Sequence, residues 1–434
     1  MSLSIRAESA EKAGDDLHIW KAVGNLYHPI ANPTGFATLG VSENTLMARE
    51  LSEHMQKLFK LPVHSFTYGD GMTGSKRIKV ALAAFLNQHL RPSKPLKPAH
   101  FRITNGCSSA VEHLAWAVAN TSAAFLLGQP YYNTFVPDLV LRTGCKVIPV
   151  DFGTTDPMAP EAISHYQRAL EMAAAAGQRV AGLVISNPHN PIGRCYSRAS
   201  LLSLMSFCGK NDMHFISDKI YALSVWENKV DQGFKQVPFE SCLSLSSNGL
   251  LAPDRIHTIW GMSKDFGANG LRIGTVISQS NPSLHKALVA VALYSSPSSA
   301  SDHIAANMLE DEKWSDSFIR TNRIRLADRY DLVVRWANSH GVPYAAGTRA
   351  AFFLWADLGS VWKRHNPRTV KDEELDDFMM KLFLEYRVYV SSGKDFGSES
   401  VGWFRIVFSQ YEVQLLTGLE RVAAALKSGV TVEL

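Results

Sequence analysis

Long apolar runs are missing from this chain of 434 residues. No segment reaches the ~18 unbroken apolar residues that a membrane-spanning helix needs, so we expect no membrane partner. The opening segment, MSLSIRAESAEKAGDD, mixes charges and lacks the apolar stretch of a signal peptide. We therefore expect no export and place the protein in the cytoplasm.

The chain also has few cysteines, and neither positive nor negative charge dominates it. The five cysteines are an odd number, scattered without a Cys-x-x-Cys pair, at positions 107, 145, 195, 208 and 242. This pattern argues against a disulfide framework and against a metal site. Lysine and arginine total 44 against 40 acidic residues, a net charge of +4, and no long run of like charges occurs. We expect no nucleic-acid partner.

What is present suits a large folded protein. The length exceeds the ~100–200 residues of one ordinary domain, so two domains are expected. In the middle of the chain, helical patterns such as VEHLAWAVANT alternate with short apolar runs, namely AAFLLGQP, CKVIPVDF, AGLVISNP, HFISDKIY, RIHTIWGMS and TVISQ. This alternation predicts an α/β fold with a mostly parallel sheet flanked by helices. Ligand sites are expected at the carboxyl ends of its strands.

After about residue 290 the pattern changes. A long helical stretch over 302–341 precedes the strand-like AAFFLWADL, the helical DEELDDFMMKLFLEY, the strand-like VYVSS and GWFRIVFS, and a final helix, EVQLLTGLERVAAALKS. We interpret this part as a smaller α+β domain. The predicted division is a large domain over 61–300, a small domain over 301–434, and an N-terminal segment over 1–60 that packs with the small domain.

A lysine in a glycine-rich turn is the first candidate for chemistry. In WGMSKDFGANGLRIG, residues 260–274, Ser263 and Lys264 follow an apolar run, and Arg272 comes eight positions after the lysine. A buried lysine with a lowered pKa is the nucleophile for a carbonyl cofactor, and the arginine fork suits a phosphate. Taken alone, a Ser-Lys pair is more typical of a surface lysine in a solvated loop, since most lysines are solvated.

Two further motifs end predicted strands. In SDKIYA, Asp218 could hold a protonated pyridine nitrogen, and Tyr221 could hydrogen-bond a ring hydroxyl. In SNPHNPIGR, two Asn-Pro steps enforce a turn, and Asn190 could donate its amide to a ligand oxygen. The alternatives are a helix N-cap for the aspartate and an ordinary turn for the asparagine.

A candidate phosphate cradle precedes the helical VEHLAWAVANT. The small residues Gly106, Cys107 and Ser108 stand where backbone N–H groups and a helix dipole can hold an anion. In QPYY, Tyr131 could stack on a planar ring. A plain N-cap and simple core packing are the alternatives. The order and chemistry of all five motifs nevertheless fit one ligand.

These motifs resemble the class I/II aminotransferase family of fold-type I enzymes that use pyridoxal 5′-phosphate (PLP). Within it, the chain is most similar to the 1-aminocyclopropane-1-carboxylate (ACC) synthase branch. The likeness runs through almost the whole sequence, from GVSENTL (40–46) through QPYYNTFVPDL, SNPHNPIG, SDKIYA and SKDFGANGLRIG to GWFRIVFS (402–409).

The resemblance implies a role for each matching residue. Lys264 holds PLP as a Schiff base and then moves the substrate Cα proton. Asp218 holds the pyridine nitrogen, while Asn190 and Tyr221 flank the ring hydroxyl. Tyr131 stacks on the ring. The residues that hold the phosphate are Gly106, Cys107, Ser108, Ser263 and Arg272. The residues that hold the amino-acid substrate are Arg405, Glu43 and Asn190. Such enzymes are homodimers with shared active sites, so we expect a dimer.

Two positions depart from the family pattern. The family has a phosphate-contacting serine three residues before the lysine, where this chain has Gly261. It also has a tyrosine that reaches the neighbouring subunit's phosphate, and Met72 aligns there, with Tyr68 four residues earlier. Because that tyrosine is linked to catalysis in ACC synthases, these departures favour an ACC-synthase-like protein over an authentic ACC synthase.

The expected chemistry begins with a Cα carbanion of an α-amino acid. Our leading hypothesis is a lyase that acts on a sulfur-bearing amino acid or conjugate, such as a carbon–sulfur lyase. The second hypothesis is an aminotransferase that passes the amino group to a 2-oxo acid. A non-catalytic PLP-fold protein is a third, and the chain has no basic segment of the kind that DNA-binding regulators carry.

Overall fold

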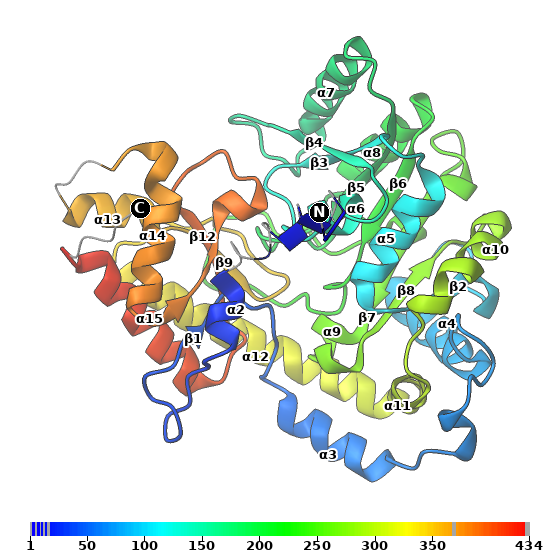
Figure 1. Ribbon diagram of the computed structural model, residues 1–434, viewed down its shortest axis with the longest axis horizontal. Coiled ribbons are helices and arrows are strands. Elements are labelled where there is room, and N and C mark those ends of the chain that lie inside the picture. The colour runs from blue at the N-terminus through cyan, green and yellow to red at the C-terminus, as the bar shows by residue number, and fades with distance from the viewer. Residues whose placement is uncertain are drawn as a thin grey trace.

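The structure is a computed structural model that describes residues 18–366 and 370–429, together with 2–4, 7, 8, 10, 11 and 14. Its largest sheet has seven strands in the order β2-β8-β7-β6-β5-β3-β4 (Figure 1). These strands are β2 (Phe101–Asn105), β3 (Ala124–Gly128), β4 (Lys146–Val150), β5 (Val180–Ser186), β6 (His214–Asp218), β7 (Ile256–Gly261) and β8 (Ile273–Ile277). Neighbouring strands from β4 to β7 pair in parallel, and β8 runs antiparallel to β7 and β2. The predicted mostly parallel sheet is confirmed.

Helices cover both faces of this sheet, which is why its central strands are apolar on both sides. Every residue of β5, β7 and β8 is buried. One face packs on α4 (Lys76–Leu90), α7 (Ile163–Ala175) and α8 (Arg198–Lys210), and the other on α5 (Gly106–Val118), α6 (Phe135–Val140) and α10 (Pro282–Val291). Serine hydroxyls begin two of these helices, because Ser75 and Ser197 accept hydrogen bonds from first-turn amides.

The second part of the molecule is smaller and mixes antiparallel strands with helices. Strands β11 (Ser391–Ser392), β12 (Trp403–Val407) and β9 (Phe353–Asp357) form an antiparallel sheet. Three helices pack with it, α13 (Leu358–His365), α14 (Asp372–Glu385) and α15 (Glu412–Lys427). The predicted smaller α+β part is confirmed. Strand β1 (Ala37–Thr38), which follows α2 (His18–Val23), pairs in parallel with β10 (Val388–Tyr389), so this early segment lies on the smaller part.

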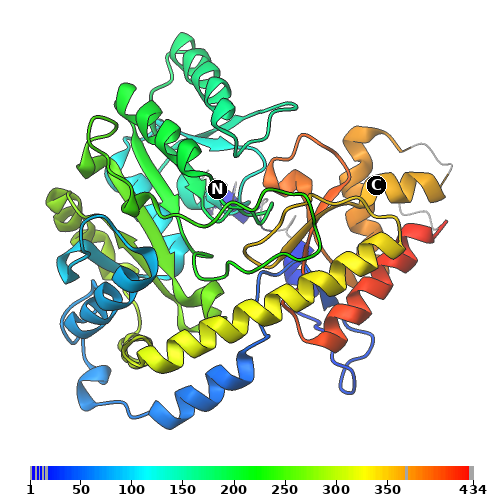
Figure 2. The same cartoon turned by 180° about the vertical axis from the view of Figure 1, so that it is seen from behind.

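A long helix connects the two parts. The stretch predicted as one helical region is two helices, α11 (Ser299–Glu310) and α12 (Glu312–Ser339). The break falls at Asp311, whose side chain accepts from the Trp314 amide and caps α12. Seen from behind, α12 crosses beneath both parts (Figure 2). Helix α11 packs against α4 and α3 (Ala48–Leu58), so the predicted boundary at residue 301 falls inside α11, and the three-part division stays a prediction.

Two classes of site are absent from the described residues. None of the described helices is long and apolar enough to cross a membrane. Within the same part of the chain, no group of three or more histidine, cysteine or acidic side chains could hold a metal ion.

Candidate active site

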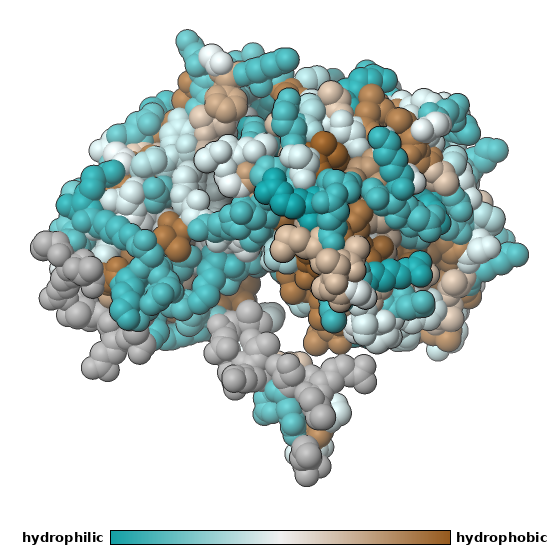
Figure 3. Space-filling model, turned by 90° about the horizontal axis from the view of Figure 1, so that it is seen from above, coloured by the Kyte–Doolittle hydropathy of each residue, from teal (hydrophilic) through white to brown (hydrophobic). Residues whose placement is uncertain are grey.

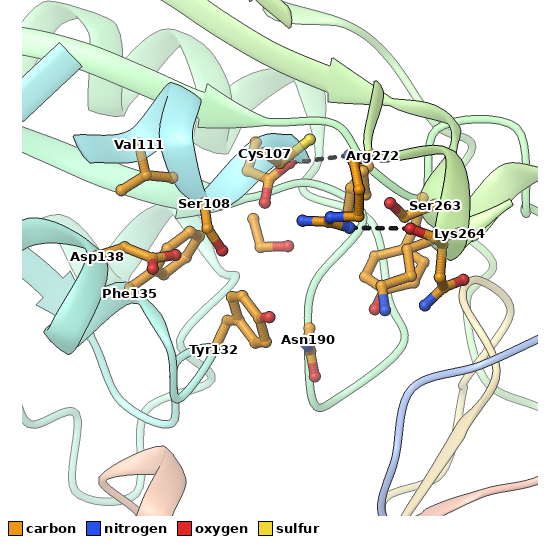
Figure 4. Close-up of a pocket in the computed structure, with 15 residues that line it drawn as sticks. Cys107, Ser108, Val111, Tyr132, Phe135, Asp138, Asn190, Ser263, Lys264 and Arg272 are labelled. Atoms are coloured by element: carbon orange, nitrogen blue, oxygen red, sulfur yellow. Dashed lines mark hydrogen bonds between the residues drawn. The ribbon is translucent and has the colours of Figure 1, made fainter. Parts of the chain in front are cut away.

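A cavity lies where the motifs selected from the sequence converge, at the carboxyl ends of the parallel strands (Figure 4). Asp218 ends β6, Lys264 follows β7 in the short helix α9 (Met262–Asp265), and Cys107 follows β2. The cavity wall consists of Cys107, Ser108, Val111, Tyr132, Phe135, Asp138, Ser186, Asn190, Asp218, Ile220, Tyr221, Ser263, Lys264, Asn269 and Arg272. Residues more than 150 positions apart in the chain therefore share one site.

Lys264 is the basic group of this cavity. Its Nζ donates a hydrogen bond to the Ser42 carbonyl at 2.5 Å. Burial, helped by the positive charge of Arg405 and opposed by Glu43, lowers the pKa of Lys264 to about 8. A lysine in this state has an appreciable neutral fraction near pH 7, and the neutral amine is the form that attacks a carbonyl or accepts a proton.

An acid and a phenol lie on the same wall. Asp218 is only 4% exposed, and its Oδ1 accepts from the Ile220 amide at 2.9 Å. Burial raises the pKa of Asp218 to about 7, so its charged form needs a cationic partner inside the cavity. Burial also raises the pKa of Tyr221, whose ring packs edge-on against Phe352 and Phe353. The phenol therefore keeps its proton and can donate a hydrogen bond.

The start of α5 and the arginine before β8 form an anion-binding corner. Gly106 has φ +78°, which L side chains rarely adopt, and a Cβ there would lie 2.1 Å from Nη2 of Arg272 and displace the guanidinium. Arg272 donates to the Asn269 carbonyl at 3.0 Å and pairs with no carboxylate in the described residues. Ser263 is 7% exposed, and its hydroxyl makes no hydrogen bond within the described part of the chain. These donors can hold a phosphate.

The two adjacent tyrosines, Tyr131 and Tyr132, lie differently with respect to the cavity. Tyr131 does not line the cavity, because its ring packs against Gly397 and its amide donates to the Phe396 carbonyl. Tyr132 lines the cavity instead, and burial raises its pKa to about 12. Tyr132 is therefore the tyrosine of this pair that lines the cavity, and stacking by Tyr131 on a ring stays a prediction.

Arg405 lies on β12 of the smaller sheet and is 3% exposed. Its guanidinium donates to Oδ1 of Asn190 at 2.9 Å and to the Gly40 carbonyl at 2.8 Å. The guanidinium carbon lies 4.4 Å from the ring centre of Phe353 and 4.7 Å from that of Phe396, and Nε has no hydrogen-bond partner. A buried cation without a carboxylate partner in the described residues suits an anionic ligand.

Several other candidates from the sequence lie outside the cavity wall, namely Glu43, Met72, Tyr68, Arg405 and Gly106. Glu43 is exposed, although its carboxylate is close enough to act on Lys264. Met72 does not line the cavity, and Tyr68 is 79% exposed beside α11. A contribution from Met72 or Tyr68 to a neighbouring subunit's site therefore stays a prediction.

The cavity also contains residues that sequence reasoning missed. Asp138, on the short helix α6, accepts a hydrogen bond from the Thr134 hydroxyl at 3.4 Å, and burial raises its pKa to about 6. Asn269 lines the wall with its Oδ1 buried and unpartnered. Asp138 resembles any acid in a helical first turn, and Asn269 lies in a glycine-rich loop, so neither carried a distinguishing signal.

This fold, with a lysine and an anion-binding corner at the carboxyl edge of a seven-stranded sheet, defines an aminotransferase-type α/β protein. The family model of aminotransferase class I and II matches residues 37–422, and the chain belongs to that family. It is 31% identical over 410 residues to the 1-aminocyclopropane-1-carboxylate synthase-like protein 1 of Bos taurus, covering 92% of this chain and 78% of the relative. It is also 31% identical over 424 residues to 1-aminocyclopropane-1-carboxylate synthase 7 of Arabidopsis thaliana, covering 93% and 90%.

Solved structures show the same fold at lower identity. The aspartate aminotransferase of Thermus thermophilus with maleate superimposes with a TM-score of 0.72 at 20% identity. The match covers 98% of this chain and all of that one. This likeness supports the architecture alone.

Proposed function

We propose that this protein is a PLP-dependent enzyme that removes the Cα proton of an amino acid. The observation that carries the proposal is that Lys264, Asp218 and Arg272, which follow or precede three different strands, line one cavity. Each supplies a different property: a neutral amine, a buried acid and an unpaired guanidinium.

The side chains in the cavity fit PLP. Arg272, Ser263 and the first amides of α5 would hold its phosphate, and the unpartnered Ser263 hydroxyl is free to donate. Asp218 would pair with the ring nitrogen, and Tyr132 would lie against the ring. When bound, PLP supplies a carbonyl carbon and an electron-withdrawing ring.

Three residues of the chain have separate proposed roles toward the substrate and the cofactor. Arg405 would hold the α-carboxylate through its planar fork. Lys264 would take the proton from Cα, since its lowered pKa provides the neutral amine near pH 7. Tyr221, which keeps its proton, would donate a hydrogen bond to the ring hydroxyl.

For the reaction class, we propose a lyase that eliminates a sulfur leaving group from an amino acid or conjugate. The likeness to ACC synthases supports it, because those relatives are named for a reaction that is not amino transfer. The departure at Met72 separates this chain from an authentic ACC synthase. Amino transfer to a 2-oxo acid is the competing reaction, and the assay below separates the two.

The assay uses purified protein loaded with PLP, supplied with S-conjugates of cysteine and homocysteine. We expect release of a thiol, ammonia and a 2-oxo acid, none of which the Lys264→Ala variant produces. If no thiol appears while 2-oxoglutarate-dependent amino transfer is rapid, the lyase proposal is wrong and the enzyme is an aminotransferase. If PLP binds but a broad amino-acid panel produces neither products nor a spectral change, a non-catalytic role replaces both.

We also propose a homodimer with shared active sites. Large apolar side chains are exposed before α4, with Val63 at 84%, Phe66 at 77% and Tyr68 at 79% exposure. The Ser299 hydroxyl ties this segment to the start of α11. The view from above looks onto the side of the molecule opposite this segment, and there hydrophobic side chains lie mainly in the right half (Figure 3). Exposed apolar patches of this kind are typical of protein interfaces.

Light scattering of the Val63→Asp and Phe66→Asp variants tests the dimer. We expect the wild-type mass to be twice that of the chain, and the two variants to dissociate because each buries a charge at the interface. Val413→Asp, an exposed position on α15, serves as the control. A wild-type monomer would refute the proposal.

A further inference from the structure

Cys107 differs from the other cysteines of this chain. Cys145, Cys195, Cys208 and Cys242 are buried, whereas Cys107 is partly exposed. It is the second residue of α5 and forms part of the cavity wall (Figure 4). Among the cysteines of the described residues, Cys107 is therefore the one beside the cavity.

On the side of Gly261, the Cys107 sulfur is closely packed. A Cβ on Gly261 would lie 2.7 Å from Sγ of Cys107, so the sulfur occupies the space beside this glycine. The same Cβ would lie 2.7 Å from the Ile273 carbonyl oxygen and 3.2 Å from Cα of Gly274. Backbone atoms of β7 and β8 thus surround this side of the thiol. A group added to the sulfur therefore has no room on the Gly261 side.

That side of the thiol is the anion-binding corner. Ser263 is 93% buried, its hydroxyl makes no hydrogen bond in the described residues, and it lines the same cavity. Arg272 lines it as well, donates to the Asn269 carbonyl, and has no carboxylate partner within the described ranges. A buried hydroxyl without a partner and a guanidinium without a carboxylate suit an anionic ligand at this corner.

We propose that Cys107 is a thiol-modification site inside the phosphate cradle, where a sulfur adduct and the cofactor phosphate exclude each other. The inference rests on the proposed function, since the phosphate is that of PLP. In the modification, the Cys107 thiolate attacks one sulfur of a low-molecular-weight disulfide. A mixed disulfide forms, the old S–S bond breaks, and the second sulfur leaves as a thiolate that takes up the proton lost by Cys107. The protein sulfur is oxidised and the leaving thiol is reduced.

The charges around Cys107 affect how fast its thiol is modified. Burial and the nearby Asp218 raise the pKa of the Cys107 thiol well above its usual range, while Arg272 and Lys264 oppose the shift. Only the thiolate reacts, so modification is slow near neutral pH and accelerates as the pH rises.

The experiment treats cofactor-free protein with methyl methanethiosulfonate, which adds a methylthio group to thiols, and reads the adduct by mass spectrometry of peptides. We expect one adduct, on Cys107, and protection of about tenfold or more by saturating PLP or pyridoxine 5′-phosphate. Pyridoxine, which lacks the phosphate, should protect far less. The adduct should weaken PLP binding, measured by absorbance titration, by about tenfold or more, and dithiothreitol should restore it.

Two variants complete the design. In Cys107→Ser, the reagent should no longer change PLP affinity, whereas the Cys195→Ser variant should respond like the wild type. Absence of an adduct on Cys107, or unchanged PLP affinity of the methylthiolated protein, would overturn the inference while the proposed function stands. If the untreated protein fails to bind PLP, the proposed function itself is wrong, and the inference falls with it.

Discussion

Arg405 donates through Nη1 to Oδ1 of Asn190 at 2.9 Å. This hydrogen bond joins β12 of the smaller sheet to the loop that follows β5 of the large sheet. Because Asn190 lines the cavity, the two halves of the molecule meet at the point where the substrate carboxylate is proposed to bind. The Asn190 side chain therefore orients the guanidinium fork before a ligand arrives.

Replacing Arg405 by alanine should mainly weaken amino-acid binding. We expect KM to rise about 30-fold or more, because one charge-assisted contact in a buried site is lost, with a smaller change in kcat. Arg405→Lys should recover only part of the loss, since an ammonium cannot form the bidentate fork. Steady-state kinetics are the measurement, and Arg421→Ala is the control, because Arg421 binds the Gly35 and Pro33 carbonyls away from the cavity. An unchanged KM in Arg405→Ala would remove the carboxylate role.

Substitutions of the adjacent Tyr131 and Tyr132 should affect PLP affinity to different extents. Tyr132→Ala should lower PLP affinity about three- to tenfold, the contribution of one aromatic contact. Tyr131→Ala should change it less, because that ring packs against Gly397 outside the cavity. Absorbance titration of both variants decides the matter, and a larger loss in Tyr131→Ala would reverse our placement.

Most of the fold follows from local sequence patterns. The apolar runs that become β3 to β8 are too short for helices and are separated by helical periodicity, which leaves a parallel α/β sheet as the consistent solution. The same rule predicts that Asp218, at the end of β6, and Lys264, after β7, meet at one edge of the sheet. Both line the cavity. Their chemical roles stay predictions.

The remaining features depend on how the folded chain orients and buries particular side chains, which local sequence patterns do not determine. Which of Tyr131 and Tyr132 faces the cavity depends on the course of the backbone after Pro130. Asp138 becomes unusual only when tertiary packing buries it beside Ser108. The break between α11 and α12 occurs at an aspartate, a residue that also occurs within helices. In each case long-range packing outweighs the local pattern.

The rate at which cofactor-free protein captures PLP should report the pKa of Lys264. The neutral amine attacks, so the rate should rise with pH and level off near pH 8, where the lowered pKa lies, rather than near the ~10.4 of an ordinary lysine. Stopped-flow absorbance between pH 6 and 10 measures it. A rate that continues to climb through pH 10 would show that the Lys264 amine has an ordinary pKa.

A buried histidine pair should make the fold sensitive to acid. Nδ1 of His214 lies 3.0 Å from Nε2 of His257, and burial lowers their pKa values to about 4 and about 3. In the unfolded chain both take up protons near ~6.5, so their contribution to stability is present above that pH and is lost as the pH falls toward the folded values. Urea unfolding at several pH values measures the loss.

His257→Gln should make the dependence of the unfolding free energy on pH shallower by up to about 1.4 kcal/mol per pH unit between pH 6 and 4. The control is His28→Gln, an exposed position. An identical slope in wild type and His257→Gln would show that His257 is not held neutral in the fold.

The most direct test of the central claim is to locate the cofactor bond. Protein loaded with PLP is reduced with sodium borohydride, digested and analysed by mass spectrometry. We predict a single pyridoxyl-phosphate adduct, on Lys264, and its absence from Lys264→Arg. Lys219, fully buried and hydrogen-bonded to Ser217 at 3.0 Å, is the nearest rival by burial. An adduct on Lys219 or any other lysine, or none at all, would contradict the assignment of Lys264 as the anchor.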